Sequence, residues 1–134
     1  MIIAVDFDGT IVQHKYPEIG SEIPFATATI RRLIEEQHQV ILWTVRQGQL
    51  LQDAVDWCKE HGIEFYAVNK SYPEEEANSG YAKVNAELFI DDRNLGGLPD
   101  WGNIYRMIKE KKTWRDIYSE TEAPRRKKKK KWLW

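Results

Sequence analysis

The stretch Ile3-Ala4-Val5-Asp6-Phe7-Asp8-Gly9-Thr10 decides the fold of this chain. Its apolar run ends at once in two carboxylates and a glycine, which is typical of a buried strand that stops at a polar edge. In an open parallel sheet, ligands bind in the crevice beyond the carboxyl ends of the strands. The sequence therefore predicts that the two aspartates face a ligand.

A second apolar run, Leu88-Phe89-Ile90, ends in the same way, in Asp91-Asp92. If both runs are strands of one sheet, carboxylates from both meet at one edge. Two unit charges about 4 Å apart repel by roughly 4 kcal/mol at an effective dielectric constant near 20, so such a cluster favours a bound cation. Oxygen ligands without His or Cys are typical of Mg²⁺. We therefore expect a Mg²⁺ site held by four aspartates: Asp6, Asp8, Asp91 and Asp92.

Strand and helix patterns alternate along the rest of the chain. We expect strands at 2–6, 39–43, 64–68 and 87–90, and helices from Pro24 onward, at 47–61 and at 100–112. This order favours a mostly parallel sheet whose right-handed crossovers are covered by helices. The loops at 11–23 and 69–82 are too short for an inserted domain, but each is long enough to cover part of the site.

Four motifs in sequence order resemble those of the haloacid dehalogenase-like (HAD) superfamily. They are D-x-D-G-T from Asp6 to Thr10, a threonine after a hydrophobic strand at Thr44, the lysine Lys83, and the acidic pair Asp91-Asp92. The resemblance spans most of residues 1–112 and leaves no room for a cap domain. It implies a three-layer α/β/α sandwich with a Rossmann-like sheet, and a capless phosphatase domain over residues 1–124.

The resemblance also implies an activity, that of a Mg²⁺-dependent phosphoric monoester hydrolase working through an aspartyl-phosphate. Asp6 would be the nucleophile, and Asp8 the general acid and base. Thr44 and Lys83 would stabilise the phosphoryl group. Lys70 follows the third expected strand and is the alternative to Lys83 for that place.

Three more residues adjoin the motifs. We expect Thr10 to hold Asp8 through its hydroxyl or to contact the substrate. Arg46 and Arg93 would contact the leaving group or brace the acidic cluster. Together with Lys70, the alternative motif lysine, Thr10 and Arg46 are the candidates for contact with the substrate.

The charge of the chain is unevenly distributed. Residues 125–131 hold 7 of the 20 Lys and Arg, so residues 1–124 carry 13 basic against 21 acidic side chains, a net charge of −8. A block of like charges is usually disordered, and we expect this for a basic tail at 125–134. Because Trp132 and Trp134 follow the basic run, the tail could contact nucleic acid. The alternative function is a non-catalytic or regulatory binding module that uses this tail.

Location and partners are predicted from the same sequence. No run approaches the roughly 20 apolar residues of a membrane helix, and the opening run is too short for a signal peptide. The single cysteine, Cys58, excludes an intramolecular disulfide. We expect a cytoplasmic protein that does not bind a membrane and acts on a phosphorylated substrate, small or macromolecular. A site without a cap further favours cover by a homo-oligomer or by a large substrate.

Overall fold

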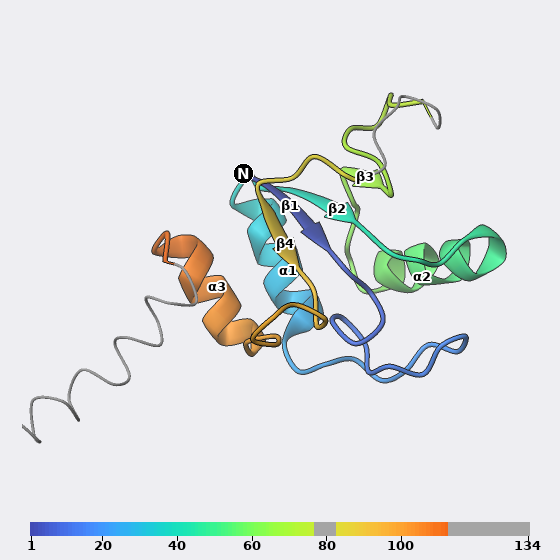
Figure 1. Cartoon of the computed structure of the whole chain (residues 1–134), viewed down its shortest axis with the longest axis horizontal. Helices are drawn as coiled ribbons and strands as arrows, with labels where there is room; N and C mark the ends of the chain where they lie inside the picture. Colours follow the sequence, from blue (N-terminus) through green and yellow to red (C-terminus); the bar gives the residue numbers. More distant parts are fainter. Residues whose placement is uncertain (77–82, 113–134) are drawn as a thin grey trace, which may run out of the picture. The chain divides into compact units, whose positions relative to one another are not determined.

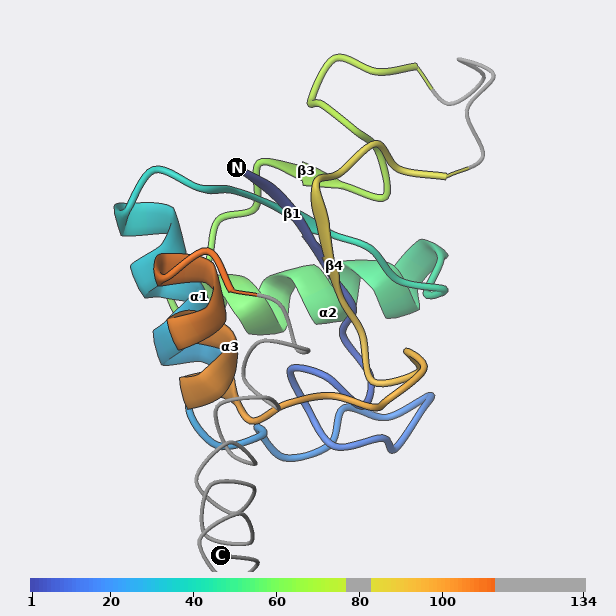
Figure 2. The same cartoon turned by 60° about the vertical axis from the view of Figure 1, so that its left-hand side comes forward.

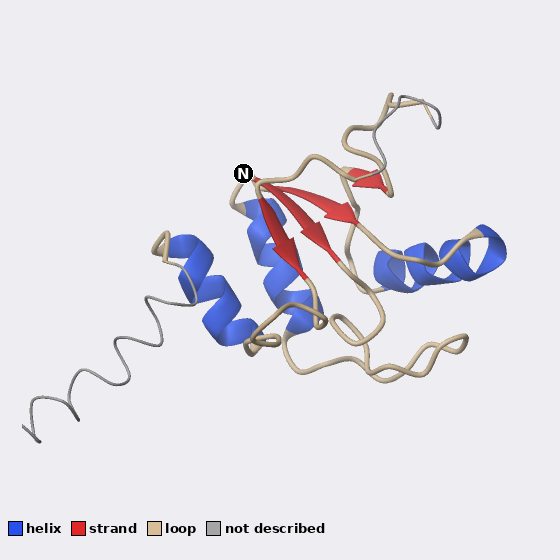
Figure 3. Cartoon of the chain, viewed as in Figure 1, coloured by secondary structure: helices blue, strands red, loops and turns tan. Residues whose placement is uncertain are grey.

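The computed structural model describes residues 1–76 and 83–112, and within them it is a small α/β protein (Figure 1). The strands are β1 (Ile2–Val5), β2 (Gln39–Leu42), β3 (Ala67–Val68) and β4 (Leu88–Ile90), and the helices are α1 (Ala26–Glu35), α2 (Gly48–Glu60) and α3 (Trp101–Lys109). All strand pairings are parallel, in the order β3-β2-β1-β4 (Figure 3). The predicted α/β class and parallel sheet are confirmed, whereas the basic tail at 125–134 lies outside the described residues.

Helices α1 and α2 lie on the same face of the sheet. The chain passes from β1 through α1 to β2, and from β2 through α2 to β3, moving in one direction across the sheet. Right-handed crossovers taken in one direction place their helices on one face. The two views in Figures 1 and 2 agree with this placement. Ile30 and Leu33 of α1 and Ala54 of α2 are fully buried, as expected for amphipathic helices on a sheet.

The other face of the sheet is packed by the connection between β3 and β4. Ala4, Ile41 and Ala67 come from three neighbouring strands, and Val84 of the connection packs with them into one buried cluster. Val84 therefore covers part of the face that lacks α1 and α2, a few residues before β4 begins. This connection therefore brings the chain to β4, next to β1.

Several elements are shorter than expected. Phe25 has a left-handed backbone with φ of 67°, which is not helical, so α1 begins at Ala26 rather than at Pro24. The third strand is only two residues long and ends before Asn69, whose φ of 54° is also left-handed. Helix α2 fits the expected 47–61 closely, with Gln47 and His61 as its caps.

Residues 1–101 form one compact unit and residue 102 begins a second, so α3 is described by itself. Its apolar residues Ile104, Met107 and Ile108 follow the predicted helical spacing, and Ile104 and Ile108 are buried. Among the described helices, none combines the length and the apolar character needed to cross a membrane.

Cys58 supplies a test of the packing of α2. Its side chain is fully buried, and burial raises the pKa of its thiol to about 12. Because the thiolate is the reactive form, only about one thiol in 10⁴ is ionised at pH 8, and we expect the native protein to resist thiol reagents. Labelling with a chromogenic disulfide, with and without urea, measures this. Fast labelling of the native chain would contradict the buried position.

Candidate functional site

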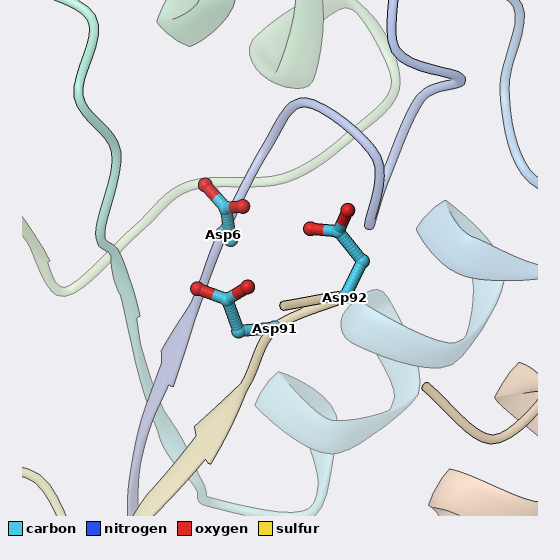
Figure 4. Close-up of side chains that lie close together, drawn as sticks. All are labelled: Asp6, Asp91 and Asp92. Carbon is cyan, nitrogen blue, oxygen red and sulfur yellow. The ribbon is translucent and has the colours of Figure 1, made fainter. Parts of the chain in front are cut away.

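Three aspartates meet at the carboxyl ends of β1 and β4 (Figure 4). Val5 pairs with Ile90 in these neighbouring parallel strands, and the amide of Asp6 donates a hydrogen bond to the Ile90 carbonyl at 3.0 Å. The residues that follow each strand are therefore neighbours. One carboxylate oxygen from each of Asp6, Asp91 and Asp92 lies within 4.8 Å of the other two.

The donor set of this cluster fits Mg²⁺. Two oxygens on opposite sides of an octahedral Mg²⁺ are about 4.2 Å apart, because each Mg–O distance is about 2.1 Å. Neighbouring oxygens of such an ion are about 3.0 Å apart. Carboxylate oxygens within 4.8 Å of one another would reach these separations if their side chains moved together around the ion. The structure brings together three of the four aspartates predicted as ligands, and Asp8 is the one left outside the cluster.

Electrostatics make the cluster unfavourable without a cation. Burial, together with the charges of Asp91 and Asp92, raises the pKa of Asp6 to about 7, against a hydrogen bond from the Phe7 amide that lowers it. The uncharged form of Asp6 is thereby favoured in the folded protein. A bound divalent cation would reverse this preference, because it stabilises the ionised carboxylates.

Thr10 holds Asp92 rather than Asp8. Its hydroxyl donates to Asp92 Oδ1 at 3.2 Å and accepts from the Asp92 amide at 3.1 Å, while its carbonyl accepts from Trp101 Nε1 at 3.0 Å. The prediction that the Thr10 hydroxyl holds Asp8 was wrong. After the turn at Gly9, which has a φ of 84°, Thr10 lies beside Asp92 at the end of β4. Thr10 is also fully buried, which leaves it no surface for a substrate.

Asp8 is paired with Arg46. Arg46 Nε donates to Asp8 Oδ2 at 2.8 Å, and Arg46 Nη2 donates to Asp8 Oδ1 at 2.7 Å. This hydrogen-bonded carboxylate raises the pKa of the Arg46 guanidinium. Because the Arg46 side chain is completely buried, the structure supports its expected bracing role and not direct contact with a substrate.

Thr44 stands just beyond β2, at the same edge of the sheet. Its amide donates to Asn69 Oδ1 at 2.8 Å, and its hydroxyl oxygen accepts from the Arg46 amide at 3.2 Å. Among residues 1–76 and 83–112 no acceptor takes the hydroxyl hydrogen of Thr44, which would leave it available to a substrate. Asn69 was missed by the sequence analysis, although an asparagine directly after a strand is a signal for the left-handed conformation that it adopts.

The two candidate lysines lie in different places. Lys83 is exposed, with Nζ 4.7 Å from the centre of the Phe89 ring. Lys70 is half-buried beyond β3, and its Nζ donates to the Pro73 carbonyl at 3.2 Å. In the described part of the chain neither lysine is ion-paired with the aspartates, so the choice between them stays a prediction. Arg93 is exposed, and its amide donates to Asp91 Oδ1 at 2.8 Å.

A comparison with solved structures finds a close relative. A conserved protein from Bacteroides thetaiotaomicron is 63% identical to this chain, and the match covers 89% of this chain and 98% of the other, with a TM-score of 0.84. The two chains thus belong to one family and share one fold. No family profile and no curated protein matches the sequence.

The turn at Gly9 gives a test of the cluster. A Cβ at Gly9 would overlap the Asp92 carboxylate and would need the disfavoured left-handed backbone. We expect Gly9→Ala to lose roughly 1–2 kcal/mol of stability from the backbone alone, and in addition most Mg²⁺ affinity. Gly97→Ala is the matched control, because Gly97 has a φ of 82° with open space at its Cβ. Calorimetric Mg²⁺ titration and urea unfolding measure both effects. Equal Mg²⁺ affinity in the two variants would argue against the cluster as the site.

The raised pKa of Asp6 gives a second test. The folded protein binds this proton more tightly than the unfolded chain does, so in chelator stability should fall as the pH rises from about 4 to about 7 and stay low above that. Asp6→Asn should therefore stabilise the metal-free protein at pH 8 by roughly 1–2 kcal/mol, with little effect at pH 4. The exposed Asp56→Asn is the control, and urea unfolding at both pH values measures the difference. Destabilisation of the Asp6 variant at pH 8 would contradict the electrostatic reasoning.

Proposed function

We propose that this chain is a Mg²⁺-dependent phosphohydrolase of the haloacid dehalogenase-like type, which forms an aspartyl-phosphate at Asp6. The observation that carries the proposal is the convergence of Asp6, Asp91 and Asp92, with one oxygen of each within 4.8 Å of the others. The four motifs quoted from the sequence support the same activity, since the first and the fourth supply these three aspartates.

Each residue of the proposed site has a defined part. Asp6, Asp91 and Asp92 would hold Mg²⁺, which when bound neutralises charge on the phosphoryl oxygens. The free oxygen of Asp6 attacks phosphorus, as expected of a carboxylate nucleophile. Thr44, whose hydroxyl hydrogen is available, donates to a phosphoryl oxygen. Lys70 or Lys83 adds positive charge beside the phosphoryl group. Asp8 acts as the general acid and base.

The proposal includes the three-layer arrangement and the missing cap of the superfamily. Val84, between β3 and β4, packs against Ala4, Ile41 and Ala67 on the face that α1 and α2 leave open, which supports a further layer on that face. The loop at 11–23 closes on itself, because the amide of Gln13 donates to Ser21 and that of Ile23 to Ile11, both at 2.8 Å. Such a compact loop supports a capless enzyme whose phosphorylated substrate is covered only in part.

Hydrolysis of 4-nitrophenyl phosphate tests the activity. We expect turnover with Mg²⁺, none in excess chelator, and recovery when Mg²⁺ is restored. Asp6→Asn should lower kcat by several orders of magnitude, because the nucleophile is lost. The exposed Asp56→Asn should match the wild type, since Asp56 lies on the surface of α2, where it accepts a hydrogen bond from Gln52. Ordinary turnover by a folded Asp6→Asn protein would refute the mechanism.

A further inference from the structure

Asn69 ties the ends of β2 and β3 together. Its backbone amide donates to the carbonyl of Leu42, the last residue of β2, at 2.7 Å, and its side-chain Oδ1 accepts from the Thr44 amide at 2.8 Å. The backbone of Asn69 is left-handed, with a φ of 54°, a conformation that asparagine tolerates better than most residues. The side chain of Asn69 thus reaches from the end of β3 to the residues that follow β2, and lies beside Thr44.

The hydrogen bond from Thr44 fixes the orientation of the Asn69 side-chain amide. A backbone N–H can only donate, so the atom that faces it is the carbonyl oxygen, and the NH₂ group is the other end of the same amide. In the part of the chain that the structure describes, no acceptor takes either hydrogen of this NH₂ group, and Asn69 is only half-buried. Two N–H donors are therefore available next to Thr44.

Thr44 presents a third donor at the same place. Its hydroxyl oxygen accepts from the Arg46 amide at 3.2 Å, so the hydroxyl hydrogen points away from that amide. The Arg46 guanidinium adds no donor, because it is completely buried and is paired with Asp8. Thr44 and Asn69 together thus offer one O–H and two N–H groups, all of them uncharged.

A ligand with several acceptor oxygens fits these three donors. In the sheet, β2 lies between β1 and β3, so Thr44 stands one strand away from Asp6. Neighbouring strands are about 4.8 Å apart, which brings a group bonded to Asp6 within reach of donors beyond β2. On the basis of the proposed function, we infer that Asn69 is a further substrate-binding residue, whose NH₂ group donates to the phosphoryl oxygens alongside the Thr44 hydroxyl.

This role predicts a particular kinetic effect. The phosphoryl oxygens are present in the substrate and in the product phosphate alike, so the Asn69 NH₂ group binds both. Its loss should therefore raise KM and weaken the binding of inorganic phosphate, and change kcat far less. Hydrogen bonds to a charged group typically contribute roughly 10- to 100-fold in affinity.

Two variants test this role. Asn69→Gly removes the whole amide, and glycine keeps the left-handed backbone. Asn69→Asp keeps an oxygen for the Thr44 amide but replaces the two N–H donors by a second oxygen. With Mg²⁺ present, calorimetry gives the affinity for inorganic phosphate, and hydrolysis of 4-nitrophenyl phosphate gives kcat and KM. We expect phosphate affinity and kcat/KM to fall roughly 10-fold in Asn69→Gly and on the order of 100-fold in Asn69→Asp.

A double-mutant cycle separates donation by Asn69 from a mere effect on Thr44. Thr44→Val removes the hydroxyl with little change of shape. If Asn69 itself donates, adding Asn69→Gly to Thr44→Val lowers kcat/KM several-fold further. Gln37→Glu is the control and should match the wild type. It makes the same change from amide to carboxylate at an exposed residue with a left-handed backbone, beside the amino end of β2.

Three results overturn the inference alone. The first is hydrolysis with unchanged phosphate affinity in Asn69→Gly. The second is an Asn69→Asp protein that matches the wild type while Asn69→Gly does not, because the oxygen that holds Thr44 would then be the part that matters. The third is the absence of any further loss in the Thr44→Val background. If the wild type with Mg²⁺ hydrolyses no phosphate ester, the proposed function fails and the inference fails with it, which is a distinguishable result.

Discussion

The parallel register between β1 and β4 is the constraint on which the candidate site depends. Because Val5 lies opposite Ile90, the two strands end level with each other. The aspartates that follow them, Asp6 on β1 and Asp91 and Asp92 on β4, are therefore held close together. The same register that satisfies the backbone hydrogen bonds therefore forces like charges together. Burial of the apolar strands stabilises the sheet, and part of this stabilisation offsets the repulsion between the carboxylates.

Much of this arrangement could be predicted from the sequence, for a physical reason. Apolar runs of strand length that end in Asp pairs identify both the buried strands and the edge at which ligands bind. The helical spacing of Leu51, Val55 and Cys58 likewise located α2 almost to the residue, although Ala54 rather than Val55 is fully buried with Cys58. These are local patterns, and the local geometry of strands and helices preserves them.

The roles of Thr10 and Asp8 were harder to predict, because they depend on contacts between distant parts of the chain. Thr10 and Asp92 are 82 residues apart, and Arg46 and Asp8 are 38 apart. Neither spacing has a sequence signature. The left-handed backbone of Phe25 also prevents the helix from beginning at Pro24, as the sequence had predicted. An aromatic residue does not signal a positive φ, so this could not be predicted. Side-chain pairing across loops is thus the part of the site that required the three-dimensional structure.

The hydrogen bond from the Trp101 indole to the Thr10 carbonyl has a consequence for the order of folding. It joins the turn that follows the first strand to a residue 91 positions later, and Trp101 is almost completely buried. During synthesis the chain emerges from its amino terminus, so the first aspartates exist long before their partners do. The acidic cluster and its repulsion can arise only after β4 has left the ribosome. If the proposed Mg²⁺ site is correct, metal binding is a late event in the biogenesis of this protein, coupled to the completion of β4.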